Sequence, residues 1–456
     1  MVEKSTEQNS AQGLSSEFVS TVINAIEYGK KDQFLELIGE LHEADVADLI
    51  EQITPEQRAA LISIWGQNFD FDVVGELDEK IRDEVVALIP PNKIVSSVGE
   101  MESDEIVDIV EDLEPEQKNR IINALPEPDQ AAVEMAFRYP EDTAGRIMQR
   151  RMVMAPEGAR VGQTIDQLRQ NHNLPDDFYH IIIVNPVMKP IGQVPLGRLM
   201  ASQRDVELSM IADEDFRTIP DHQDQHDVAY AFNQYHLISA PVTNSSGQLV
   251  GVITIDDAMN VLDEEAEEDL LRLGGVSDES LTDRVWGITK QRFPWLIVNL
   301  FTAILASIVI YHFSSTIEAI VALAVLMPIV ASMGGNAGTQ SLTVAVRAIA
   351  TKDLTDSNSW RVIKREGLVG LINGLIFALI IGSVGYFWYG YQALGVVLGA
   401  AMIITMLVAG LSGILIPLGL KKVKVDPAVA SSVFVTTLTD VVGFLAFLGL
   451  AAVILL

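Results

Sequence analysis

One carboxyl group stands inside the apolar last segment of the chain, residues 427–456. Asp440 falls roughly 20 Å along a helix long enough to span a bilayer. A carboxylate there costs roughly 3 kcal/mol or more unless it faces water, a cation or a partner group. Thr436 and Thr437 precede it by four and three residues, so the three side chains share one helix face. This pattern indicates a cation site on a pore; the alternative is a protonated or hydrogen-bonded Asp at a helix interface.

A second apolar segment, residues 317–346, carries side-chain amides among closely spaced glycines. Asn336 and Gln340 are four residues apart and share a helix face. Gly334 and Gly335, with a proline earlier in the segment, loosen the helix and let backbones approach. Asn336 either lines a pore or belongs to tight helix packing held by amide hydrogen bonds, and both can be true.

Six acids crowd into seven residues just before the membrane part: Asp263, Glu264, Glu265, Glu267, Glu268 and Asp269. Such like charges repel one another and destabilise a helix unless something neutralises them. Hard cations do so through oxygen ligands, and Mg²⁺ often through the waters it retains. We therefore predict that this run senses cations; the alternative is an exposed, flexible linker.

The charge of the chain is unevenly distributed between its two parts. Residues 285–456 hold ten basic and six acidic residues, whereas residues 1–284 hold 21 basic and 56 acidic, a net charge of −35. A front part this acidic excludes nucleic acid as a partner and attracts divalent cations. The chain has no cysteine, which excludes disulfides, thiolate metal sites and Cys nucleophiles.

Five apolar segments must position Asp440 and the amides, and each can span a bilayer of about 30 Å. They cover residues 293–313, 317–346, 366–388, 395–420 and 427–456. Basic residues precede the first segment and lie between the second and third and between the fourth and fifth. Because such loops stay inside, the N-terminal part is expected in the cytoplasm and the C-terminus outside a cytoplasmic (inner) membrane. The N-terminus has no apolar core of a cleavable signal, which agrees.

Residues 17–139 have apolar positions at helical spacing, after an N-terminus of residues 1–16 that we expect to be disordered. The stretch 44–58 (ADVADLIEQITPEQR) is repeated 60 residues later, at 104–118 (DEIVDIVEDLEPEQK). The proline in each copy is typical of a first helical turn after a stop. We predict an all-α domain of helical repeats with acidic faces.

Two small α/β units follow, residues 140–206 with the linker that opens them and residues 207–262. Each is expected to have a strand, a helix, two strands and a helix, and the pair resembles tandem CBS domains. The stretch 251–257 (GVITIDD) matches that family's second-strand motif, in which Thr254 and Asp257 stand where nucleotide-binding members hold a ribose. The corresponding stretch 192–198 (GQVPLGR) lacks both groups, so ATP or another adenine nucleotide is expected in the second half only. Equally, Thr254 and Asp257 can simply cap a helix.

Three stretches closely resemble signatures of the MgtE family of magnesium channels: residues 139–148 (YPEDTAGRIM), 328–340 (PIVASMGGNAGTQ) and 436–444 (TTLTDVVGF). With the domain order, the resemblance covers nearly the whole chain: the helical domain, the CBS pair, an acidic connecting (plug-type) helix at 263–290 and a five-span all-α domain at 291–456.

The resemblance implies a homodimer in lipid, with a Mg²⁺ pore between the two membrane domains. Asp440 would be the selectivity acid, supported by Asn336, while cytosolic Mg²⁺ would close the pore by binding the acidic N and CBS domains. The acids implied in sensing are Asp257, Glu265, Glu268 and Asp269, so Asp257 is claimed by both a nucleotide and Mg²⁺. Physical chemistry agrees, because Mg²⁺ prefers one or two carboxylates and keeps several waters.

Glu318 can attract ions at the outer mouth of such a pore, but it also completes a Ser315-x-x-Glu318 capping box, the role we favour. Alternative functions are a divalent transporter of broader selectivity (Mn²⁺, Co²⁺, Ni²⁺), an ion-coupled secondary transporter and a CBS-linked sensor that transports nothing. Ion coupling would need a further buried acid or His, and Asp440 alone is predicted at such depth. No nucleophile is paired with a base and no glycine loop is typical of phosphate binding, so an enzyme is not expected.

Overall fold

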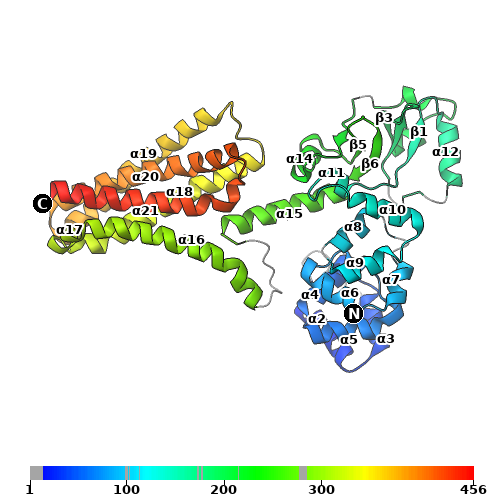
Figure 1. Cartoon of the computed structure of the whole chain (residues 1–456), viewed down its shortest axis with the longest axis horizontal. Helices are drawn as coiled ribbons and strands as arrows, with labels where there is room; N and C mark the ends of the chain where they lie inside the picture. Colours follow the sequence, from blue (N-terminus) through cyan, green and yellow to red (C-terminus); the bar gives the residue numbers. More distant parts are fainter. Residues whose placement is uncertain are drawn as a thin grey trace. The chain divides into compact units, whose positions relative to one another are not determined.

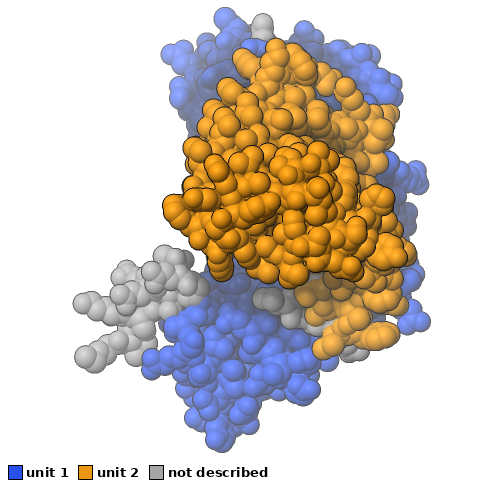
Figure 2. Space-filling model, turned by 90° about the vertical axis from the view of Figure 1, so that its left-hand side faces the viewer, with its two compact units in different colours: residues 1–264 blue, residues 265–456 orange. Residues whose placement is uncertain are grey.

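The structure is a computed structural model that describes residues 14–97, 101, 103–111, 113–171, 174–175, 178–213, 215–276 and 285–456. Its contacts divide the chain into two units, residues 1–264 and 265–456, which Figure 1 shows as ribbons and Figure 2 as atoms. The predicted fold class is confirmed: helices, then two small α/β domains, then five long apolar helices.

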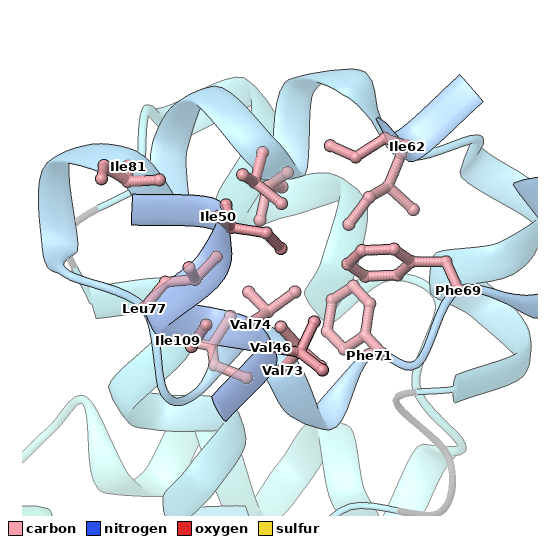
Figure 3. Close-up of a cluster of buried hydrophobic side chains, with 14 of the residues drawn as sticks. Val46, Ile50, Ile62, Phe69, Phe71, Val73, Val74, Leu77, Ile81 and Ile109 are labelled. Carbon is pink, nitrogen blue, oxygen red and sulfur yellow. The ribbon is translucent and has the colours of Figure 1, made fainter. Parts of the chain in front are cut away.

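The first unit begins with an all-helical domain, whose core lies between helices from both halves of that domain (Figure 3). Its elements are α2 (Ser16–Glu27), α3 (Lys31–Ile38), α4 (Glu43–Gln52), α5 (Pro55–Trp65), η1 (Gly66–Asn68), η2 (Asp72–Val74), α6 (Glu79–Leu88), α7 (Pro91–Ser97), α8 (Ser103–Glu111), α9 (Pro115–Ile122) and α10 (Glu127–Ala136). Ser15 caps α2 by accepting from Phe18 N. Residues 1–13, most of the stretch predicted to be disordered, lie outside the described residues.

The repeat predicted from the sequence forms two helix–turn–helix copies, α4–α5 and α8–α9. In the first copy Thr54 accepts a hydrogen bond from Gln57 N, and the Gln57 side chain accepts one from Thr54 N. Pro55 occupies the first turn of α5, and Pro115 does the same in α9. The proline therefore starts a helix in both copies, as predicted, because its missing N–H is not needed there.

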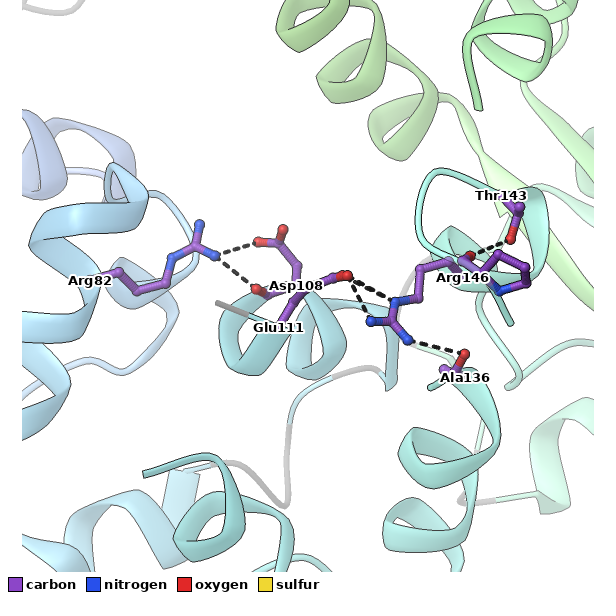
Figure 4. A network of polar contacts seen from close by, with 7 residues as sticks. Arg82, Asp108, Glu111, Ala136, Thr143 and Arg146 are labelled. Carbon is purple, nitrogen blue, oxygen red and sulfur yellow. Dashed lines mark hydrogen bonds and ion pairs between the residues drawn. The ribbon is translucent and has the colours of Figure 1, made fainter. Parts of the chain in front are cut away.

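A linker helix, α11 (Ala144–Ile147), ties the helical domain to the α/β domains through a buried arginine (Figure 4). Arg146 forms an ion pair with Glu111 at 2.7 Å and donates to the Ala136 carbonyl oxygen at 3.3 Å. Its guanidinium also stacks over the Phe137 ring, 4.2 Å from the centroid. A second arginine, Arg82, pairs with Asp108 at 3.1 Å on the other side of α8. These contacts join α6, α8, α10 and the linker within one unit.

Each α/β domain contains a three-stranded sheet with the same topology. The first consists of β1 (Met154–Pro156), α12 (Val161–Gln170), β2 (His180–Val184), β3 (Pro190–Pro195), α13 (Leu196–Ala201) and the short η3 (Leu208–Met210); the second consists of β4 (Ile219–Pro220), α14 (Gln225–Tyr235), β5 (Ser239–Thr243) and β6 (Leu249–Thr254), followed by α15 (Ile255–Leu273). In each sheet the first two strands are parallel and the last two antiparallel. This is the strand, helix, two strands and helix expected from the sequence.

Helix α15 differs from its sequence-based interpretation, which ended the second α/β unit at 262 and began a separate connecting helix at 263–290. One helix runs from Ile255 to Leu273 and includes all six acids of the run. Arg272, in its last turn, pairs with Glu268 one turn earlier and offsets part of the repulsion. The helix then ends at Gly274 and Gly275, the latter with a φ of +74° that favours glycine.

The second unit holds the five predicted spans, which the structure confirms as long apolar helices. They are α16 (Val285–His312), α18 (Ala322–Ala350), α19 (Ser359–Tyr389), α20 (Gln392–Lys422) and α21 (Pro427–Ile454), with the short α17 (Ser314–Ala319) before α18. Helix α20 lies centrally, against α18, α19 and α21, and is the most buried of the five. The predicted second span began at 317, but a break at residues 320–321 separates α17 from α18.

Candidate functional site

Asp440 lies in the middle of α21, in a partly exposed position. No hydrogen bond or ion pair of its carboxyl group is found within the described residues. Thr437 donates its hydroxyl proton to the Val433 carbonyl oxygen at 2.6 Å, while the Thr436 side chain is exposed. The carboxylate is therefore available to a cation, and the alternative of an Asp hydrogen-bonded at a helix interface finds no partner in the part of the chain described.

Two glycines of α18 set the position of Asp440 by letting α20 and α21 approach. A Cβ on Gly334 would lie 2.5 Å from Thr405 Cγ2 and 3.4 Å from Thr439 Cβ, next to Asp440. A Cβ on Gly338 would lie 2.6 Å from Val435 Cγ1. Gly335 has nothing within 4 Å of such an atom. The predicted close approach thus holds for Gly334 and not for Gly335.

A polar stripe runs along the exposed side of α18, inside the membrane span. We define it by its exposed side chains, which are Ser332, Asn336, Thr339, Gln340 and Thr343. Asn336 Nδ2 donates to Ser332 Oγ at 3.4 Å. Thr339 and Thr343 donate to the backbone carbonyl oxygens of Gly335 and Thr339, which gives these hydroxyls the partners that polar groups within hydrocarbon require. The sequence analysis singled out only Asn336 and Gln340; the available signal was the i, i+4, i+7, i+8, i+11 spacing of hydroxyl and amide side chains.

Glu318 is exposed on α17, but the predicted capping box is wrong. Helix α17 begins at Ser314, so Ser315 already lies in its first turn, and no side chain caps the N-terminus. The backbone carbonyl of Phe313 instead accepts from Thr316 N and Ile317 N, both at 3.1 Å. Capping therefore does not explain Glu318, and its predicted role at the outer mouth stays a prediction.

The acidic run is spread around α15 and does not converge. The side chains of Asp263, Glu264 and Glu267 are exposed, and those of Glu265, Glu268 and Asp269 are partly exposed. Within the described residues no three His, Asp or Glu side chains are arranged to hold a metal ion. Sensing by Glu265, Glu268 and Asp269 therefore stays a prediction.

An arginine that the sequence analysis passed over connects the acidic run to the last span. Arg272 Nη1 contacts Asp426 Oδ2 at 2.5 Å, and the same guanidinium contacts Glu268. Asp426 Oδ1 accepts from Ala428 N at 2.8 Å and so caps α21. Leu273 packs on the same end, against Leu342, Val346, Ala428 and Val435. The signal available in the sequence was a lone base after six acids and an Asp-Pro before the last span.

Thr254 and Asp257 contact each other at the start of α15. Thr254 Oγ1 donates to Asp257 Oδ2 at 2.7 Å, and Thr254 N donates to the same oxygen at 3.3 Å. Burial raises the pKa of Asp257 to about 7, with Asp256 and Glu105 adding negative charge nearby and the Thr254 bonds opposing the rise. This is the helix-capping arrangement that the sequence left as an alternative, and it places Asp257 near an acid of α8.

A small cavity of about 20 Å³ lies between the two α/β domains. Its polar lining residues are Gln149, Arg151, His180, Gln193, Ser239 and Thr254. His180 Nδ1 and Ser239 Oγ are 2.6 Å apart, and burial lowers the pKa of His180, which favours the neutral ring. Thr254 thus faces the cavity, whereas Asp257 is not among its described lining residues. The two predicted ribose-binding residues differ in their access to this cavity.

Three family models match the chain: a divalent cation transporter model at residues 327–450, the MgtE intracellular N domain at 41–142 and a CBS domain at 207–264. The magnesium transporter MgtE of Thermus thermophilus is 30% identical over 439 residues, covering 94% of this chain and 97% of the relative. The chain belongs to the MgtE family. This confirms the resemblance found in the sequence, and the family is one of transporters, not enzymes.

Two further relatives are also magnesium transporters named MgtE. The magnesium transporter MgtE of Enterococcus faecalis is 34% identical over 69% of this chain and 70% of that protein, and the one of Bacillus subtilis is 27% identical over 95% and 97%. A solved structure of the cytosolic domain of a Mg²⁺ channel MgtE in complex with ATP has a TM-score of 0.50 at 24% identity, covering 53% of this chain and 99% of that one. Its likeness supports the fold of the cytosolic domains.

Proposed function

We propose that this MgtE-family protein is a Mg²⁺-selective channel that mediates Mg²⁺ uptake across the cytoplasmic membrane. The observation that carries the proposal is Asp440, a carboxyl group in a spanning helix without a hydrogen-bond or ion-pair partner among the described residues. Mg²⁺ dehydrates reluctantly and prefers one or two carboxylates with several waters kept. The names of the relatives, all magnesium transporters, point to the same cation.

The pore is formed by a homodimer. The polar stripe of α18 and the exposed Thr436 of α21 offer one half of a polar lining, and a two-fold axis would place a second half opposite. Two copies of Asp440 would then form a ring of acids of the kind that selects cations. Gly334 and Gly338 would support the pore by fixing α21 against α18.

Cytosolic Mg²⁺ closes the pore by binding the acidic N and CBS domains. Asp257 and Glu105 bring two acids of different domains close together, and the acidic run adds six more along α15. A cation between such acids would remove their repulsion. Arg272 and Leu273 link the end of α15 to the capped start of α21, so a movement of α15 would displace the helix that bears Asp440.

An adenine nucleotide binds between the two CBS domains. The relative solved with ATP supports this, together with Thr254, Ser239 and His180, which line the cavity there. The cavity of about 20 Å³ is too small for a nucleotide, so binding requires the lining side chains to move apart. Thr254 would contact the ligand directly, and Asp257 would act on it through the Thr254 hydroxyl.

The membrane orientation follows from the basic loops. Lys and Arg residues lie in the first turns of α16 and at the end of α18, the start of α19 and the end of α20 with the loops that follow α18 and α20, whereas the other two connections hold none. Because basic loops tend to stay inside, this distribution supports N-terminal domains in the cytoplasm and a C-terminus outside.

Mg²⁺ uptake into proteoliposomes tests the function. Wild type and Asp440→Ala are compared at low and high Mg²⁺ on the cytoplasmic side, with Asp356→Asn, an exposed acid of the loop before α19, as the matched control. The wild type and the control should conduct at low Mg²⁺ and be suppressed at high Mg²⁺, and Asp440→Ala should be inactive or unselective. Equal conduction by wild type and Asp440→Ala would contradict the proposal.

The same assay separates the alternatives. Uptake of Mn²⁺, Co²⁺ and Ni²⁺ at rates equal to Mg²⁺ would indicate a broader divalent transporter. Absence of uptake under every condition, with the purified protein still binding Mg²⁺, would indicate a sensor that transports nothing.

A further inference from the structure

A second polar site lies within the membrane unit, at a cavity of about 190 Å³ between α18, α19 and α20. Four polar side chains line it, Gln340 and Ser341 of α18 and Glu366 and Asn373 of α19, with Gly370 and Gly410 beside them. Because a single water needs only about 10–15 Å³ of such space, the cavity has room for several waters. Polar lining and this volume distinguish it from an ordinary packing defect between apolar helices.

Close helix packing forms the wall of this cavity. A Cβ on Gly370 would lie 2.7 Å from the Met406 carbonyl oxygen, and one on Gly410 would lie 2.9 Å from the Glu366 carbonyl oxygen. The backbones of α19 and α20 are therefore in contact beside the cavity. The polar side chains of α18 and α19 then meet across the remaining space, because no bulky residue stands at the two glycine positions.

Glu366 supplies a negative charge to this cavity. Its side chain is 13% exposed, and Oε2 accepts a hydrogen bond from Ser341 Oγ at 3.1 Å. The cation beside it among the described residues is Arg365, at 3.2 Å from Oε1, whose side chain is 61% exposed. An arginine so exposed is hydrated and screened, so it balances the carboxylate only weakly. A largely buried carboxylate beside water-sized space favours a cation in that space.

We propose that this cavity is a second binding site for a hydrated divalent cation, with Glu366 as its anionic ligand. The oxygens of Ser341, Gln340 and Asn373 complete a lining suited to the waters that Mg²⁺ retains. The site is distinct from Asp440, since Ser341 lies seven residues, about 10 Å along α18, from Gly334, which packs next to Asp440. The inference rests on the proposed function for the identity of the cation and not for the existence of the site.

A local paramagnetic measurement on the full chain tests the site. The protein has no cysteine, so Leu368→Cys, an exposed position of α19 outside the cavity lining, accepts a single nitroxide label. Bound Mn²⁺ close to the label shortens its relaxation, and Mn²⁺ titration gives the concentration at half effect. The measurement is made on the labelled Leu368→Cys protein and on four labelled double variants, which carry Glu366→Gln, Asp440→Asn, Asn373→Leu or Gln340→Leu as the second substitution.

We expect Glu366→Gln to raise the Mn²⁺ concentration at half effect at least tenfold, and Asp440→Asn to leave it within twofold. Asn373→Leu and Gln340→Leu, which change exposed side chains and spare the fold, should each raise it several-fold. An unchanged Mn²⁺ titration in Glu366→Gln would overturn the site. If Glu366→Gln does not fold, unchanged titrations in both leucine variants would overturn it instead. Loss of the effect in Asp440→Asn would assign the signal to Asp440 and also overturn it. Failure of the pore would instead show in the uptake assay.

Discussion

At the residue scale, the acids of this chain differ more in their surroundings than in their chemistry. Asp440 and Glu366 both lie in spanning helices, but Asp440 has no partner among the described residues, whereas Glu366 is held by Ser341 and Arg365. Asp257 lies in the cytosolic part, buried against the Thr254 hydroxyl and near Glu105. Burial and neighbouring groups, not residue type, therefore distinguish the three acids.

Asp257 makes stability depend on pH in a defined direction. Its folded pKa, raised to about 7, lies above its unfolded value, so the folded state binds more protons between about pH 4 and 7. The stability of the wild type relative to Asp257→Asn should therefore fall as the pH rises from about 4 to about 7 and stay constant above. The thermal unfolding midpoints of both proteins in chelator measure this.

Mg²⁺ gives the control for that measurement. If Asp257 ligates Mg²⁺, adding Mg²⁺ at pH 8 should stabilise the wild type more than Asp257→Asn. A difference in midpoint between the two proteins that does not vary between pH 4 and 8 would contradict the raised pKa.

At the element scale, glycine placement decides which helices touch. Gly334→Ala should destabilise the membrane unit by about 1–3 kcal/mol, because the new Cβ would overlap Thr405 Cγ2 at 2.5 Å. Gly335→Ala is the matched control, with nothing within 4 Å, and should be neutral or slightly stabilising in the same helix. Thermal midpoints in detergent compare the two variants. Equal losses in both would show that α18 does not approach α20 at Gly334.

The contact between α15 and α21 is the second prediction at this scale. Arg272→Gln removes the charge that separates Glu268 from Asp426, so the two acids then repel. A partly exposed ion pair contributes up to about 1 kcal/mol. We therefore expect the cytosolic Mg²⁺ concentration that closes half of the pores to be two- to fivefold higher in Arg272→Gln than in the wild type. Lys290→Gln, an exposed base in the first turns of α16, is the control. An unchanged Mg²⁺ dependence in Arg272→Gln would show that this ion pair does not transmit gating.

At the scale of the whole molecule, the polar stripe of α18 predicts where two copies meet. Thr339→Cys or Ser332→Cys should form disulfide cross-links between protomers under mild oxidation, because in the proposed homodimer both exposed positions would line the shared pore on the two-fold axis. Leu379→Cys, on an exposed apolar position of α19, should stay uncross-linked. Gel electrophoresis without reductant reads the outcome. Cross-linking at Leu379→Cys alone would place the dimer contact, and so the pore, elsewhere.

The sequence by itself determined what depends on local pattern. Five apolar segments, the helical repeat with its prolines and the order of strands in both CBS domains follow from periodicity and turn residues, and the structure confirms them. Asp440 could be singled out because one acid in a mostly apolar segment of thirty residues is conspicuous without any knowledge of packing. The family signatures were equally local, so the MgtE resemblance was available before the fold.

Only the tertiary structure decided which side chains meet across distant segments. In the structure α15 continues through the acidic run, and Arg272 offsets the charge of Glu268 there. The predicted capping box of Ser315 does not form. The tertiary structure also brought Arg272 to Asp426, 154 residues away, and Glu366 to Ser341, 25 residues away on another helix. The physical reason is that burial and pairing depend on packing between helices, which no single segment encodes.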